Sequence, residues 1–240
     1  QSAVDRTTEE TIYQNYTAYL NYNKNFGLDH HLDAMLGMAY EAEEVRMFMA
    51  RRDNFITDEL WELNLGGTGN MKNDAKAEHW ATSSAFARIG YSFKNKYILE
   101  TNFRYDGSSR FPSDERWAFF PSASVGWRIS QEPWWNVKSE HISNAKVRFS
   151  WGSLGNAAGL SNYQYIQTLG ISKSDYILDG LRQNYMSSPA ALPGNLTWET
   201  ATTYDIGADL GFFDNRLTVS GDYYIRKTTD MIVNGPTVPD

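Results

Sequence analysis

The chain has 240 residues, a net charge of −7 and no cysteine. The acidic balance leaves no basic surface to neutralise phosphates, so we exclude a nucleic-acid partner. The absence of cysteine excludes a small disulfide-stapled domain. The mean hydropathy of −0.54 and the lack of a run of about eighteen apolar residues exclude a membrane-spanning helix. They leave open a transmembrane β-barrel, in which only every second residue is apolar.

The amino-terminal part of the chain contains two segments that alternate apolar with polar residues, at 11–26 and from Leu32 to Ala42, with a short connection at 27–29. A period of two predicts strands that have one apolar face. The charged, glycine-rich stretch at 43–78 predicts a long loop. Its acidic rim is expected to be solvated rather than to bind calcium, because no EF-hand spacing is present. The rim comprises Glu41, Glu43, Glu44, Asp53, Asp58 and Glu59.

Six further segments repeat the same alternation. Their predicted ranges are 80–93, 97–105, 118–130, 146–151, 204–212 and 217–225. Tight reversals at 94–96 and 213–216 join two pairs of them, and the connection at 131–145 has room for a short helix or helical turn. The stretch at 152–200 predicts mostly loop.

Tight turns thus alternate with long, aromatic-rich connections. Outer-membrane barrels have short periplasmic turns and long outer loops, so we assign the long connections to the outside. The predicted fold is all-β, an antiparallel transmembrane β-barrel wall of about eight strands with long extracellular loops. Charged residues at the polar positions of its strands are expected to face the lumen, where water tolerates charge. These lumen-facing residues are Glu100, Arg104, Lys146, Arg148, Asp205 and Asp209.

Aromatic residues are abundant, with 8 Trp, 15 Tyr and 12 Phe. Many stand near the predicted strand ends, where the interfacial girdles of a barrel are found. Aromatic side chains in the loops are candidate contacts for a substrate or partner, since a flat ring stacks on sugars and anchors protein interfaces; packing within the loops is the alternative. The candidates are Trp61, Trp117, Tyr163, Tyr165, Tyr176 and Tyr185.

No catalytic or metal-binding constellation stands out. His30 and His31 are adjacent, and neighbouring strand residues point to opposite faces, so we expect no metal site there. The sequence shows no distinctive carboxylate pair, nucleophile elbow or phosphate-binding glycine loop. We therefore expect neither enzymatic activity nor a cofactor. In the stretch DGSSRF at 106–111, turn chemistry accounts for the residue types, and Arg110 is expected to pair with Asp106 or Asp114.

Five stretches resemble the SusC/RagA family of TonB-dependent outer-membrane transporters of Bacteroidetes, and they follow one another in family order with hairpin spacing. They are RYDGSSRF (104–111), FPSASVGWRIS (120–130), KVRFSWGSLGN (146–156), LTWETATTYDIGADLGFF (196–213) and RLTVSGDYYIRKTTDMI (216–232). The first two predicted strands resemble the family more weakly. The resemblance implies a plugged, many-stranded barrel in the bacterial outer membrane. It also implies import of a glycan or peptide, driven by TonB and assisted by a SusD-like surface lipoprotein.

On this resemblance, residues 1–240 form part of a barrel domain, and no plug domain, TonB-contacting segment or closing carboxy-terminal strand is recognisable. A plugged transporter of this size class has about 22 strands, so eight strands make part of one wall. Residues 1–10 lack the pattern of a signal peptide, which suggests an internal or processed piece. Two alternatives remain open. One is a soluble or surface-exposed all-β module that binds carbohydrate; the other is a passive eight-stranded barrel whose interior is filled by side chains.

Overall fold

A computed structural model gives the fold and describes residues 2–57, 59–69, 71–138, 141–167, 169–178, 181–186 and 196–231. Asp58 of the predicted acidic rim and Ile232 lie outside these residues. Ten strands and two short 3-10 helices form within the described part. The strands are β1 (Ala3–Phe26), β2 (His30–Asp53), β3 (Lys72–Phe93), β4 (Tyr97–Ser108), β5 (Trp117–Arg128), β6 (Asn144–Asn156), β7 (Ile171–Leu178), β8 (Leu181–Met186), β9 (Glu199–Phe212) and β10 (Leu217–Thr229). The helices are η1 (Leu63–Leu65) and η2 (Ile129–Gln131).

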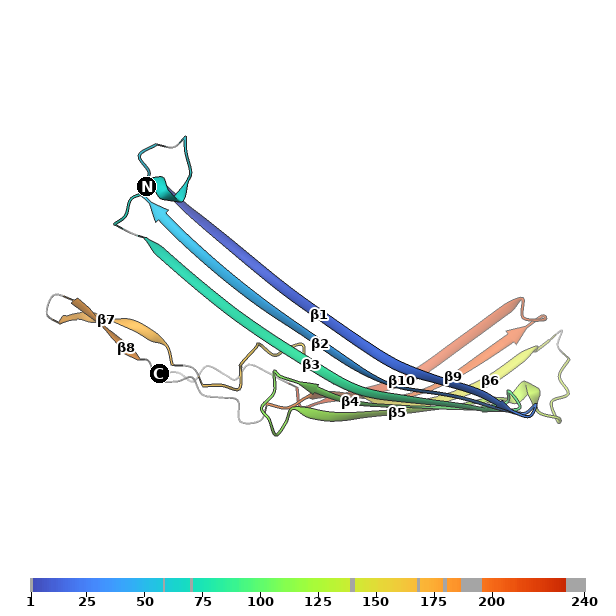
Figure 1. Cartoon of the computed structure of the whole chain (residues 1–240). Helices are drawn as coiled ribbons and strands as arrows, with labels where there is room; N and C mark the ends of the chain where they lie inside the picture. Colours follow the sequence, from blue (N-terminus) through green and yellow to red (C-terminus); the bar gives the residue numbers. More distant parts are fainter. Residues whose placement is uncertain are drawn as a thin grey trace. The chain divides into compact units, whose positions relative to one another are not determined.

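Eight of the strands form one sheet in the order β1-β2-β3-β4-β5-β6-β9-β10, and β7 pairs only with β8 (Figure 1). The pairs β4–β5, β5–β6, β6–β9 and β9–β10 are antiparallel. Each strand of the large sheet therefore lies beside its neighbour in sequence, apart from the inserted hairpin. The prediction of an all-β, antiparallel sheet of about eight strands is confirmed. No helix in the described ranges has the length and apolar character needed to cross a bilayer.

Residues with left-handed backbone form the tight turns of the sheet. Gly27 has a φ of +69°, and Lys94 and Asn95 have φ values of +53° and +52°. Two successive residues in this conformation twist the backbone in the sense that joins neighbouring antiparallel strands. The β9–β10 turn uses the same conformation from Phe213 to Asn215. The connection at 129–143 is different, because it contains η2 and is not a tight turn.

The chain divides into two compact units. Unit 1 comprises Gln1–Tyr16 and Tyr40–Thr82, and unit 2 comprises Thr17–Ala39 and Ser83–Asp240. Unit 1 contains one end of each of β1, β2 and β3 together with the connection that carries η1. Unit 2 contains the other ends of these strands and all of β4 to β10.

The predicted long loop at 43–78 is largely wrong, because β2 continues to Asp53 and β3 begins at Lys72. Glu43 and Glu44 are therefore strand residues. Both carboxylates have partners: Trp80 of β3 donates to Glu43 at 3.1 Å, and Arg46 of the same strand pairs with Glu44 at 2.6 Å. A strand with two polar faces shows no apolar alternation, so periodicity could not identify it.

The predicted loop at 152–200 is wrong in two places. Strand β6 continues to Asn156, and the hairpin β7–β8 forms a separate two-stranded sheet. The hairpin pairing shifts register between Lys173 and Ile177, which breaks the regular alternation that sequence reading depends on. This irregular pairing, together with the mixed glycine and tyrosine content of the stretch, explains why the two strands could not be recognised from the sequence.

Candidate functional site

The pairing register places the six predicted lumen-facing residues on one face of the sheet in unit 2. Lys146 is opposite Asp209, and Ser150 lies between Asp205 of β9 and Ser124 of β5. Ser124 in turn is opposite Glu100. Because side chains alternate along each strand, Arg104 and Arg148 share this face as well. We call it the polar face.

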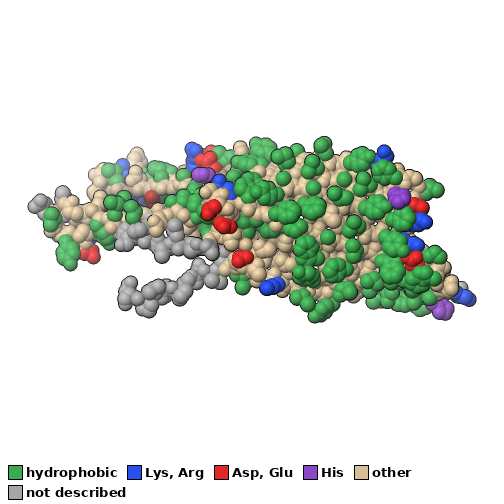
Figure 2. Space-filling model, turned by 90° about the horizontal axis from the view of Figure 1, so that it is seen from below, with side chains coloured by type: hydrophobic (Ala, Val, Ile, Leu, Met, Phe, Trp, Pro, Cys, Tyr) green, Lys and Arg blue, Asp and Glu red, His purple; other side chains and the backbone are tan. Residues whose placement is uncertain are grey.

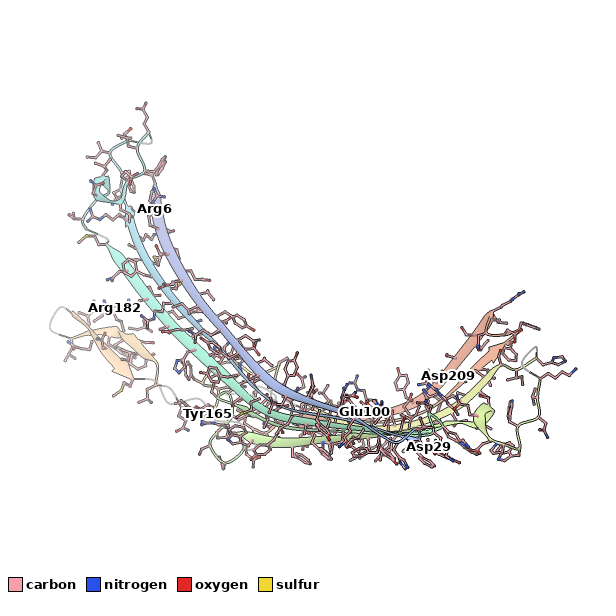
Figure 3. The ribbon with its side chains drawn as sticks, turned by 45° about the vertical axis from the view of Figure 1, so that its right-hand side comes forward. Arg6, Asp29, Glu100, Tyr165, Arg182 and Asp209 are labelled. Atoms are coloured by element: carbon pink, nitrogen blue, oxygen red, sulfur yellow. The ribbon has the colours of Figure 1, made fainter. Side chains whose placement is uncertain are left out.

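An ion-pair network crosses three strands of the polar face. The Arg148 guanidinium donates to both carboxylate oxygens of Asp209, at 2.9 and 3.0 Å, and it pairs with Asp222 of β10 at 2.9 Å (Figure 3 labels Asp209). Lys146 lies 3.9 Å from Asp209. Gly207 leaves space for the network, since a Cβ there would lie 2.9 Å from the Arg148 guanidinium and closer still to Asp222.

The prediction for Arg110 is wrong. Its Nε donates to Asn162 at 3.2 Å, whereas Asp106 accepts from Arg104 at 3.0 and 3.1 Å. Arg104 and Asp106 are two positions apart on β4 and therefore project from the same face, which keeps them within reach. Sequence reasoning also missed Asp222, although its polar position in the alternation of β10 was a usable signal, and the Arg88–Asp33 pair at 2.6 Å.

The opposite face of the same strands is apolar. One row across it runs Leu99, Val125, Phe149, Ile206 and Tyr223 by direct pairing. The side chains in this row are 42%, 50%, 46%, 54% and 68% exposed. Figure 2 shows a face on which hydrophobic side chains spread between two ends where charged and histidine side chains gather. No other layer of the described residues covers these apolar groups, as a sandwich core would require.

A shallow groove lies on the apolar face. Its volume is about 550 Å³, and its lining includes Leu99, Val125, Val147 and Phe149. Tyr97 and Trp127 close the end of the groove nearest the tight turns. The lining includes one charged residue, Arg148, whose side chain belongs to the polar face. The other lining residues are apolar, aromatic or glycine, so the groove suits hydrocarbon rather than a polar ligand.

A carboxylate at the tight-turn end of unit 2 holds the aromatic residues there in place. Glu132, in the connection after η2, accepts from Tyr97 at 2.6 Å, from Trp127 at 2.9 Å and from Lys96 at 3.0 Å. The side chains of Lys96 and Glu132 are only 12% and 7% exposed. The Tyr97 hydroxyl above all, with the Trp127 N–H and the Lys96 ammonium, lowers the pKa of Glu132 from 4.5 to about 2. Aromatic rings with polar tips fixed in this way are typical of a membrane–water interface.

Replacement of Glu132 is expected to make stability less dependent on pH in the acid range. The pKa of Glu132 is lower in the folded protein, so its contribution is fully present above about pH 4.5 and is lost as the pH falls to about 2. The difference in urea midpoint between wild type and Glu132→Gln should therefore be larger at pH 7 than at pH 2. An equal difference at both values would contradict the assigned hydrogen bonds.

A small hydrophobic core lies at the long-loop end of unit 2, where loop residues pack against Phe120 of β5. It is built from Phe111, Phe120, Leu160, Leu196 and Trp198. The Phe111 side chain is fully buried, with its ring 4.7 Å from that of Trp198, and the Trp198 indole donates to the Arg116 carbonyl at 3.1 Å. Gly155 of β6 is needed there, because any Cβ would collide with the Phe120 ring. We call this cluster the loop core.

The loop core determines where two of the six candidate aromatic residues lie. Tyr165 packs against it (Figure 3), and Tyr163, with a φ of +63°, precedes it in the same loop. The Arg110–Asn162 hydrogen bond ties this loop to the DGSSRF turn. Sequence reasoning identified the tyrosines but missed the core, because Phe111, Leu160 and Trp198 are far apart in sequence and carry no periodic signal.

The other four candidate aromatic residues are dispersed. Trp117 does not lie in a loop as predicted: it is the first residue of β5, and its ring stacks on Tyr105 at 5.1 Å on the apolar face. Trp61 lies in unit 1 beside Phe55, with centroids 5.6 Å apart. Tyr176 and Tyr185 belong to β7 and β8, and Tyr176 is 83% exposed. The structure therefore does not gather the six into one site.

The histidine pair is separated by the strand geometry. His30 approaches the Tyr91 hydroxyl at 2.6 Å, while His31 approaches the Asn25 amide oxygen at 2.6 Å. Their rings contact different neighbours because successive strand residues alternate faces. Across the described ranges, no group of three or more His, Asp or Glu side chains is arranged to hold a metal ion.

Comparisons with known proteins agree with this geometry. The family model described as "TonB dependent receptor-like, beta-barrel" matches residues 2–240. The chain is 35% identical to TonB-dependent receptor P3 of Formosa agariphila, over 96% of this chain and 22% of that protein. It is 32% identical to TonB-dependent receptor SusC of Bacteroides thetaiotaomicron, over 93% of this chain and 22% of that protein.

The solved structure of the RagAB peptide transporter is similar along nearly the whole chain. Its TM-score is 0.85 with 27% identity, over 98% of this chain and 25% of that one. The chain thus spans about a fifth of the length of the curated relatives. The barrel wall predicted from alternation has the same strand arrangement as part of a known transporter. The chain belongs to the TonB-dependent receptor-like β-barrel family.

Proposed function

We propose that the chain is part of the wall of a larger, plugged barrel in the bacterial outer membrane. The whole protein imports a nutrient, a glycan or a peptide, with energy supplied through TonB and with a SusD-like surface lipoprotein as partner. The mechanism is passage rather than a reaction, and it needs neither a cofactor nor a catalytic residue. The plug, the TonB-contacting segment and the closing strands are assigned to the rest of the protein.

One observation carries the proposal: a single sheet has an apolar face left open and an opposite face crossed by ion pairs. The apolar row at Val125 and Phe149 is about half exposed, which is unfavourable in water but favourable against acyl chains. The network of Arg148 with Asp209 and Asp222 suits a water-filled or plug-filled lumen. A sandwich module would instead bury the apolar face, so family membership and this exposure both disfavour the carbohydrate-binding module.

The remaining features follow from this orientation. The tight turns and the Glu132 cluster lie toward the periplasm, and the loop core and the β7–β8 hairpin lie toward the outside. On this assignment, Tyr163 and Tyr165 line the outer entrance of the lumen, held by the loop core. The peptide cargo of the RagAB transporter supports a peptide as one of the two substrate classes.

Uptake by the whole protein in its native cell tests the proposal. We expect deletion of its gene to abolish accumulation of either a fluorescent oligosaccharide mixture or a fluorescent peptide mixture, and complementation to restore it. A protonophore should block uptake by the complemented strain, because TonB draws on the proton gradient. A water-soluble protein that binds glycan without detergent, with no change in uptake on deletion, would favour the binding-module alternative.

A further inference from the structure

The connection between β5 and β6 differs from the other connections at its end of unit 2. Tight turns at 27–29, 94–96 and 213–216 join the neighbouring strands, whereas this connection runs from 129 to 143 and contains η2 (Figure 1). It begins beside one of these turns, because the Arg128 N–H donates to the Lys96 carbonyl at 2.9 Å. A hairpin needs only about 2–5 residues to reverse, so the extra length has another use. We call residues 129–138 the shelf.

The shelf folds back over the apolar side of the strand ends. Glu132 accepts from Tyr97 at 2.6 Å and from Trp127 at 2.9 Å, and these two paired residues belong to the apolar face. The Trp134 ring meets the Trp127 ring edge-on, with centroids 6.4 Å apart. A backbone hydrogen bond from the Trp135 N–H to the Glu132 carbonyl, at 3.0 Å, keeps the segment compact. The shelf is therefore fixed to the lipid-facing side of the wall.

Lysine side chains over aromatic rings mark the membrane–water interface at this end of unit 2. The Lys24 ammonium lies 4.9 Å from the centroid of the Phe26 ring, and the Lys94 ammonium lies 5.3 Å from that of Phe93. Phe93 in turn stacks on Tyr97 at 6.3 Å. Rings in the interface with lysine ammonium groups beside them are placed to meet lipid phosphates. The shelf, bound to the same tyrosine, lies at this level.

The shelf leaves apolar side chains uncovered. Trp134 is 58% exposed and Val137 is 42% exposed, and Lys138 beside them is exposed. Tryptophan, an aliphatic residue and lysine together are typical of segments that lie in a headgroup layer. The apolar groove ends at Tyr97 and Trp127, the residues that hold the shelf. The lipid-facing surface therefore continues from the groove onto the shelf.

A periplasmic protein is the other candidate to cover Trp134 and Val137. A stable protein complex buries about 1,000 Å² or more, and two exposed apolar side chains supply little of that area. Insertion into a headgroup layer requires only a few anchoring side chains. The side of the wall on which the shelf lies is also the side that acyl chains cover. These observations favour lipid over protein.

We propose that the shelf is an interfacial membrane anchor. Trp134 and Val137 insert among the phospholipid headgroups of the periplasmic leaflet, and Glu132 holds the segment in that position. This inference rests on the proposed function, which orients the tight turns toward the periplasm. Because an anchored segment resists displacement toward water and toward acyl chains alike, the shelf fixes the depth of this part of the wall in the bilayer.

Spin labels on the whole protein test the proposal. The chain has no cysteine, so Val137→Cys places a single label in the shelf and leaves Trp134 intact. Val125→Cys on the apolar face and Asp214→Cys in a tight turn are the lipid and water references. Each protein, freed of any cysteine elsewhere, is folded in vesicles of phosphatidylethanolamine and phosphatidylglycerol, and a heat-modifiability gel shows that it is folded. Power saturation compares collisions with oxygen, which concentrates in lipid, and with a nickel chelate, which stays in water.

We expect the label at position 137 to lie within roughly 5–10 Å of the boundary between headgroups and acyl chains, between the depths at positions 125 and 214. Nickel accessibility equal to that at position 214 would overturn the inference, and lipid contact at position 125 would then leave the proposed function standing. Protection from both reagents would mean that protein covers the shelf, and would also overturn the inference. Water contact at position 125 as well would overturn both.

Glu132→Ala in the labelled Val137→Cys protein tests the positioning role of the carboxylate. The substitution removes the acceptor for Tyr97 and Trp127, so we expect nickel accessibility at position 137 to rise to the value at position 214. Glu115→Ala is the matched control, because it removes a carboxylate that accepts from Thr197 at 3.0 Å at the long-loop end. It should leave the label unchanged. An unchanged label in Glu132→Ala would overturn the role of Glu132.

Discussion

Ala123→Arg should destabilise the membrane-inserted protein by about 2–4 kcal/mol if it lies near the bilayer midplane. Ala123 is on the apolar face between Thr101 and Trp151, its partners on β4 and β6. An arginine there must either face acyl chains or distort the bilayer to reach water. The shift is measured as the change in urea midpoint of the whole protein folded in phospholipid vesicles.

The control for this experiment is the neighbouring residue. Ser124→Arg introduces the same side chain on the polar face, opposite Glu100 and Ser150, where a cation has a carboxylate nearby. We expect its effect to stay within roughly 0.5 kcal/mol, as for a surface substitution. If both variants lose the same stability, the apolar face is not in contact with lipid, and the barrel orientation proposed above is wrong.

Phe111→Ala should open the loop core. Its side chain is fully buried against Trp198, and truncation of a buried Phe costs about 3–5 kcal/mol. Because every member of the loop core except Phe120 lies outside the strands, we expect local rather than global opening. Amide hydrogen exchange should accelerate about 100-fold or more at Ser108 and Leu160, whose N–H groups donate to Arg116 and Ala157 at 3.2 Å each. The strand amides of β9 and β10 should keep their protection.

Phe119→Ala provides the comparison for this variant. Phe119 is on the apolar face, is 56% exposed and stacks on Phe103 at 6.1 Å. The Phe119→Ala substitution removes the same number of atoms, but from a site that is exposed. Amide hydrogen exchange at Leu160 should therefore stay near the wild-type rate. If Phe119→Ala accelerated exchange there as much as Phe111→Ala, burial of Phe111 would not be what holds the loops.

The two variants also separate the two parts of the proposed mechanism. Ala123 belongs to the wall, which the bilayer supports, whereas Phe111 belongs to the loop core, which positions Tyr165. Loss of the loop core with an intact wall should therefore reduce uptake while membrane insertion stays normal. Loss of wall stability should reduce the amount of protein in the membrane.

Sequence alone determined which residues of the unit 2 strands share a face. The alternation at 204–212 and 217–225, with the turn between them, fixes the pairing of Tyr223 with Ile206 and of Asp222 with Gly207. A period of two is a local property, and a tight turn fixes the register of its two strands, so neither depends on distant contacts. For the same reason the charged set from Glu100 to Asp209 could be assigned to one face before the structure was known.

Tertiary structure decided the features that depend on distant neighbours. Glu43 lies in a strand because β1 and β3 supply hydrogen-bond partners, although its own segment has no apolar face. Arg110 bonds to Asn162, 52 residues away, rather than to the nearby Asp106. The loop core joins Phe111 to Leu160 and Trp198. Contacts of this kind depend on how the loops pack against one another in three dimensions. A local sequence pattern does not contain that information.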